Sequence, residues 1–148
     1  MAQQYYDSQR GRRGAERRAR TFTELGEVVK NEFFSDTFTN LLNMSNTSRL
    51  DEVLNAIEYF VQKEGKSLST SQLRNIYDKA IKCETLNELK LIRPNLAYLA
   101  GKSTNEKEKS LLAFIDLLIK EIRNEAQVKE FMTFFEAVVA YHKFYGKQ

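Results

Sequence analysis

The sequence predicts an all-α fold, namely a compact bundle of about five helices with a disordered basic N-terminal tail. Only one proline and six glycines occur among 148 residues, whereas all-β and loop-rich chains use both residue types heavily in their turns. Apolar residues recur every three or four positions, which is the period of an amphipathic helix. No segment alternates apolar and polar residues as a strand does. This length fits one domain, so we divide the chain into a tail (residues 1–20) and a helical domain (residues 21–148).

The tail carries all of the excess positive charge. It holds six arginines against two acidic residues, a balance of +4, while the remaining 17 basic and 18 acidic side chains leave −1. The tail contains few apolar side chains, and their burial could not offset the entropy that the tail would lose on ordering. We therefore expect the tail to be disordered. Such a tail fits either a flexible arm that pairs with RNA phosphates or a solubilising segment with incidental affinity for polyanions. The arginines of the arm would be Arg12, Arg13, Arg17 and Arg18.

The first helices follow from capping residues and apolar stripes. Thr21 or Thr23 can cap a helix whose apolar residues extend from Phe22 to Phe33. A second helix, over about residues 50–64, can be capped by Ser48 and ends at Gly65. A third helix opens at Ser69 and continues to about residue 82.

The later helices carry similar signals. Thr85 and Glu88 match a capping box ahead of a stripe that reaches Leu99. Pro94 interrupts this stripe, so we expect a kink or a restart there. Asn105 or Thr104 can begin the next helix. The last helix, about residues 126–144, is apolar around more than half its circumference, so we expect it to be central, with neighbours on two sides.

The sequence predicts no catalytic site, metal or cofactor. Cys83 and His142 are the only cysteine and the only histidine, whereas metal sites usually need several such ligands. We favour a partly buried helix position for His142 over a thiol–imidazole pair with Cys83. No phosphate-binding glycine loop is present. A lone thiol forms no internal disulfide, and no apolar stretch is long enough for a signal peptide or a membrane span, so we expect a cytoplasmic protein without membrane contact.

Cations of the helical domain offer a second candidate for polyanion binding. If the helices that carry them are antiparallel, several would share one face. The alternative is an ordinary solvated surface balanced by Asp78, Glu84 and Glu88. The cations are Arg74, Lys79, Lys82, Arg93 and Lys102.

Three segments, in order, resemble the small subunit of type III-A CRISPR effector complexes, the Csm small subunit. STSQLRNIY at residues 69–77 is similar to the family's T-x-S-Q-[IL]-R segment. RPNLAYLAGK at residues 93–102 resembles its R-x-x-L-A-Y-x-A-G-R helix end. FFEAVVAYHKFYG at residues 134–146 resembles its closing F-x-E-A-[IV]-[VI]-A-Y-x-K-[FY]-Y-G. The likeness covers roughly residues 50–148, and Lys102 stands where the family more often has arginine, which keeps the charge but loses the planar fork.

The resemblance implies a non-catalytic helical subunit. Its implied partners are target single-stranded RNA paired with guide RNA, a repeated backbone subunit, the large polymerase-like subunit and further copies of itself. The sequence of the target RNA would be read by its base pairing with the guide RNA. Contacts of the subunit with the RNA backbone, which carry no sequence information, would therefore suffice. Arg93 can equally be structural, beside the proline. The candidate RNA contacts are Arg74, Lys79, Arg93, Lys102 and Lys143.

A different class of function also fits the sequence. The protein could be a helical protein–protein adaptor without nucleic-acid contact. That hypothesis expects an exposed apolar patch, and the wide apolar face at Ala113, Phe114 and Leu117 is the candidate.

Overall fold

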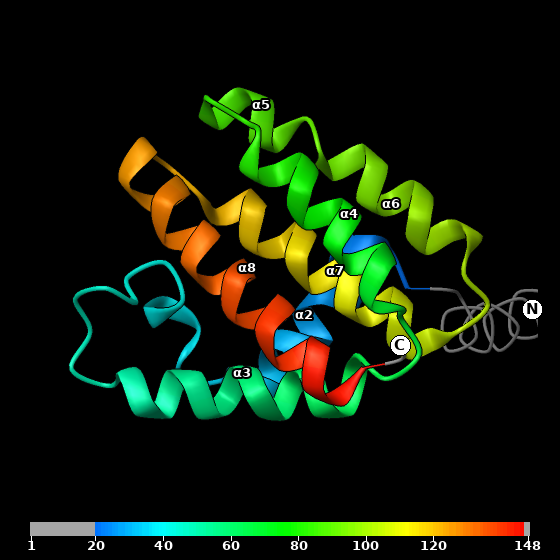
Figure 1. Cartoon of the computed structure of the whole chain (residues 1–148), viewed down its shortest axis with the longest axis horizontal. Coiled ribbons are helices and arrows are strands. Elements are labelled where there is room, and N and C mark those ends of the chain that lie inside the picture. The colour runs from blue at the N-terminus through cyan, green and yellow to red at the C-terminus, as the bar shows by residue number, and fades with distance from the viewer. Residues whose placement is uncertain (1–19, 147–148) are drawn as a thin grey trace, which may run out of the picture.

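A computed structural model of the chain describes residues 20–146, and within this part it contains helices and no strand. The all-α prediction is confirmed. Figure 1 shows the helices arranged as a bundle, with α7 running through its middle. The elements are α2 (Phe22–Phe33), the 3-10 helix η1 (Phe38–Asn40), α3 (Leu50–Glu64), α4 (Thr70–Ile81), α5 (Leu86–Lys90), α6 (Arg93–Lys102), α7 (Glu106–Glu121) and α8 (Glu125–Tyr145).

Several of the predicted caps start their helices. The Thr21 hydroxyl accepts from the Glu24 N–H at 3.1 Å, and the Glu24 carboxylate accepts from the Thr21 N–H at 3.2 Å. Ser69 forms the same reciprocal box with Gln72, and the Asn105 side chain caps α7. These motifs are predictable because every partner lies within three residues of the cap.

Two start signals behave differently from the prediction. Ser48 does not cap α3, because the helix begins one residue later, after Arg49, whose side chain makes no capping bond. The Thr85 hydroxyl accepts from the Glu88 N–H at 3.1 Å, but the Glu88 carboxylate accepts from Glu84 at 2.7 Å rather than from Thr85. The capping box at Thr85 is therefore only half formed.

Pro94 marks a restart, one of the two outcomes expected there. α5 ends at Lys90, and α6 begins at Arg93 with the proline in its first turn. The first N–H groups of a helix have no helical partner, so proline costs no hydrogen bond at this position. The restart adds one helix, and residues 20–146 hold six helices of ten residues or more plus the short α5, whereas about five were expected.

The core is organised around α7, which packs against α2, α6 and α3. The Phe114 ring stacks on Phe34 at 4.6 Å and meets Phe60 edge-on at 5.4 Å. α8 packs against α3 and α4, so the prediction that it has neighbours on two sides is confirmed. α7 is nevertheless the more enclosed helix, since nine consecutive residues from Leu111 to Ile119 are buried.

The expected apolar patch at Ala113, Phe114 and Leu117 is wrong, because all three residues are buried. The cover is α2, which approaches closely at Gly26. A Cβ atom at Gly26 would lie 2.7 Å from the Ala113 carbonyl oxygen and 3.1 Å from the Leu117 Cβ. Only glycine allows this approach of one helix to another without displacement. The apolar face expected to bind a partner protein is thus covered by α2 within the bundle.

Candidate nucleic-acid interface

Lys79 and Lys102, two of the predicted RNA contacts, lie at one pocket. Figure 1 shows that α4 and α6 run in opposite directions. α4 packs mainly against α8, and α6 packs mainly against α7, so a pocket of about 320 Å³ remains between α4 and α6. The antiparallel arrangement brings the C-terminal end of α6 beside α4. The pocket is lined by Leu68, Gln72, Asn75, Ile76, Lys79, Leu99, Lys102, Ser103, Glu108 and Leu112.

The two lysines of this pocket are available to an anion. Both are exposed, and neither ammonium group forms an ion pair with a carboxylate among residues 20–146. Lys102 Nζ lies 5.3 Å from the centre of the Tyr98 ring, and Tyr98 is 64% exposed. A cation over an aromatic face keeps its charge and remains accessible to water. The pocket is therefore lined by two cations, one of which also lies beside an exposed ring outside the lining.

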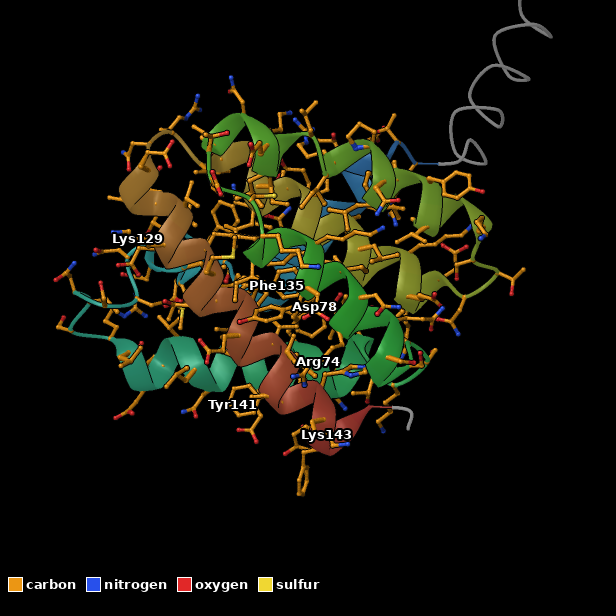
Figure 2. The ribbon with its side chains drawn as sticks, turned by 45° about the horizontal axis from the view of Figure 1, so that its top comes forward. Arg74, Asp78, Lys129, Phe135, Tyr141 and Lys143 are labelled. Atoms are coloured by element: carbon orange, nitrogen blue, oxygen red, sulfur yellow. The ribbon has the colours of Figure 1, made fainter. Side chains whose placement is uncertain are left out.

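Arg74 and Lys143 lie on a different surface. Figure 2 shows them at the same end of the α4–α8 pair, and both side chains are exposed. α4 and α8 also make an edge-on contact of Tyr77 with Phe135, whose ring centres are 5.5 Å apart. The predicted set is therefore divided between two sides of α4, because Arg74 and Lys79 are separated by five residues and point in different directions on a helix.

Arg93 has a structural partner. Its Nε atom lies 2.8 Å from Oδ1 of Asp116, a residue of α7 that is only 3% exposed. A buried carboxylate without a partner is strongly unfavourable, so this ion pair supports the structural alternative for Arg93. RNA contact by Arg93 stays a prediction. The sequence does hold the signal for the pair, since Asp116 is the single charged residue in the apolar run from Leu111 to Ile119.

Lys90 is a further cation with a structural role that was not predicted from the sequence. Its Nζ atom donates to the carbonyl oxygens of Ile119 at 3.2 Å and Lys120 at 3.0 Å. These are among the last carbonyls of α7, where a positive charge is favourable. Burial, together with the nearby Arg93 and Arg123, lowers the pKa of Lys90.

His142 is completely buried rather than partly buried as expected, because glycines on both sides let the backbone close over its ring. Its Nε2 atom lies 2.8 Å from the Gly65 carbonyl oxygen. A Cβ atom at Gly146 would approach the ring to 2.3 Å, and one at Gly65 would approach it to 3.0 Å. The imidazole joins the end of α8 to the turn after α3.

Cys83 does not pair with this histidine. Its Sγ atom donates to the Lys79 carbonyl at 3.4 Å. Burial, and secondarily the Glu88 carboxylate, raises the pKa of the Cys83 thiol, which disfavours the thiolate that a nucleophile needs. Within residues 20–146 no three His, Cys, Asp or Glu side chains are grouped to hold a metal ion.

Two further expectations concern membranes and the N-terminal tail. No helix in the described part of the chain is long and apolar enough to cross a membrane. The tail residues Arg12, Arg13, Arg17 and Arg18 lie outside the described residues, so the structure does not test either function considered for them.

The fold and the surface define a small all-α protein distinguished by cations at a pocket between antiparallel helices. The chain belongs to the family described as Csm2 Type III-A, which matches residues 44–148. It is also similar to a Streptococcus thermophilus protein named "CRISPR system Cms protein Csm2", with 29% identity over 116 residues that cover 70% of this chain and 95% of the relative. No solved structure matches the chain significantly.

Family membership confirms the resemblance noted in the three sequence segments. It makes the chain a structural subunit of a type III-A CRISPR complex that contains other Csm subunits. The match begins at residue 44, so α2 lies outside it.

Proposed function

We propose that this subunit binds the backbone of target RNA inside the type III-A complex and has no catalytic activity of its own. In this proposal it lines the channel in which target RNA pairs with guide RNA. It contacts the repeated backbone subunit, the large polymerase-like subunit and further copies of itself. Such a subunit would act in the cytoplasm.

The observation that carries the proposal is the placement of Lys79 and Lys102. Two lysines from antiparallel helices lie at the same pocket, and neither forms an ion pair with a carboxylate of the described chain. RNA phosphates are partners that such unpaired cations favour, because pairing with them releases counterions. Arg74 and Lys143, on the other side of α4, give a second group of cations that would follow the backbone further along.

The test is the affinity of the assembled complex for target RNA when Lys79 and Lys102 are both replaced by alanine. We expect weaker binding to every target sequence. The slope of log affinity against log salt concentration should fall by about one per lost phosphate contact. The matched control replaces Lys66 and Lys129, two exposed lysines elsewhere on the bundle, and should leave both quantities unchanged. Equal loss in the two double variants would refute a local contact, because it would reflect net charge alone.

Arg93 is excluded from this test for a structural reason. Its replacement would leave the buried Asp116 carboxylate without its partner, so any loss of RNA affinity could come from the fold. Arg74 offers a cleaner second variant, since its side chain is exposed and forms no ion pair within the described chain.

A further inference from the structure

The pocket between α4 and α6 offers more than two cations. Its volume of about 320 Å³ falls at the lower end of small-molecule sites, which span about 300–1,000 Å³. Apolar side chains from separate elements contribute to its lining: Leu68 before α4, Ile76 on α4 and Leu112 on α7. Leu99 adds a partly buried side chain from α6. Since Leu68, Ile76 and Leu112 are at most 3% exposed, most of the apolar contact open to a ligand would come from Leu99.

Two polar side chains at the same pocket form no hydrogen bond within the described part of the chain. The Asn75 amide makes no hydrogen bond with another described residue, and an amide can both donate and accept. The Glu108 carboxylate also lines the pocket. Although the Glu108 backbone N–H is bonded to Asn105, its carboxylate forms no hydrogen bond or ion pair within residues 20–146. A carboxylate accepts hydrogen bonds from amino groups and disfavours a carbonyl oxygen at the same position.

These groups together match one ligand chemistry, that of an unpaired nucleotide in single-stranded RNA. An unstacked base has flat apolar faces and a polar edge, and proteins bind such bases by contact with the faces and hydrogen bonds to the edge. The lysines at the pocket provide charges for the phosphates on either side. An acidic ligand in the pocket itself would meet the Glu108 carboxylate, whereas a neutral base would not be repelled.

We propose that the pocket lined by Asn75, Lys79, Lys102 and Glu108 takes an unpaired RNA base, with a preference for bases that carry an amino group. Cytosine presents an amino group where uracil presents a carbonyl oxygen, so cytosine is preferred over uracil. This inference rests on the proposed RNA-binding function and adds a base-contacting site to it.

The test titrates the full-length protein, followed by NMR, with three RNA decamers: decacytidylate, decauridylate and a decamer of abasic ribose phosphates. All three have the same backbone charge, so differences among them report base contacts. We expect decacytidylate to bind about tenfold more tightly than the abasic decamer, with decauridylate between them. The amide signals that respond to the bases should be those of residues 72–79 and 99–103.

Glu108→Gln provides the specific variant, and Glu106→Gln provides its matched control. Both remove one negative charge from the first turn of α7, but only Glu108 lines the pocket. We expect Glu108→Gln to reduce the preference for decacytidylate over decauridylate, and Glu106→Gln to preserve it. Circular dichroism of both variants checks that the fold is kept.

Equal binding of the base-bearing and abasic decamers would overturn the base pocket, and so would an unchanged cytosine preference in Glu108→Gln. No binding of any decamer would overturn it as well. The backbone contacts proposed above are judged separately, by the target affinity of the assembled complex. A complex that loses affinity when Lys79 and Lys102 are replaced, from a subunit that binds all three decamers equally, would retain the proposed function and reject the base site.

Discussion

Replacing Arg93 by alanine should destabilise the bundle more than any other single loss of charge on its surface. The Asp116 carboxylate lies in the buried stretch of α7, with its side chain 4% exposed, and the Arg93 Nε atom at 2.8 Å is its ion-pair partner. Removing one member of a fully buried pair costs about 3–5 kcal/mol. The Arg93 side chain is 32% exposed, so in the variant water can partly solvate the Asp116 carboxylate in place of the guanidinium group. We therefore expect a loss of about 2–3 kcal/mol in the free energy of unfolding.

The measurement is urea unfolding followed by circular dichroism at neutral pH. A second variant, with Arg93→Met and Asp116→Leu together, removes both charges and keeps similar side-chain volumes. We expect the double variant to be close to the unchanged protein, because replacing a buried pair by apolar residues is often neutral or stabilising. A loss below about 0.5 kcal/mol for Arg93→Ala, or a double variant as unstable as the single one, would refute this reasoning.

Three further predictions address the remaining structure. Gly26→Ala should cost about 1–3 kcal/mol of stability, because the new Cβ would lie 2.7 Å from the Ala113 carbonyl oxygen. In Gly101→Ala the new Cβ atom would meet no atom within 4 Å, so this variant should instead gain about 0.4–1 kcal/mol of stability. Thermal unfolding of both variants measures these changes, and a change of the opposite sign in either variant would contradict the prediction. Thr21→Ala should cost about 1 kcal/mol by removing the N-cap of α2, whereas no change in urea unfolding would argue against a contribution of that cap. Burial raises the pKa of Glu64, so its ionised form is disfavoured in the folded state. Glu64→Gln should therefore raise the melting temperature at pH 7 and lose this advantage below the unfolded-state pKa of about 4.3; an equal gain at pH 3 would contradict the electrostatic cause.

Local features of the fold are the part that the sequence predicts well. The caps at Thr21, Ser69 and Asn105 each bond to a group three residues away, so a short segment contains all the information. The same is true of Pro94, whose missing N–H and ring geometry act on the adjacent turn. Ser48 is not the cap, and the residue before α3 is instead Arg49, whose side chain reaches back to Asp36 and forward to Glu52.

Composition and spacing predict only part of the candidate site. Lys79 and Lys102 are both predicted from the sequence, and the structure places both at one pocket. Arg74 is predicted in the same set, but it lies on another surface of α4 beside the end of α8. Without the packing of α4 on α8 and of α6 on α7, nothing in the residue pattern distinguishes these surfaces. The pocket residues Asn75 and Glu108 carried no signal at all, since single polar residues on helices are common.

By itself, the sequence determined the helical class, most helix starts, the restart at the proline and the three motifs that place the chain in its family. Tertiary structure alone decided that Phe114 is covered by α2, that Arg93 pairs with Asp116, and that Lys79 and Lys102 meet at one pocket. The physical reason is the range of the interactions. Capping and helical periodicity act between neighbours three or four residues apart, whereas burial and pairing join residues from different helices, whose positions follow only from the packing of the whole bundle.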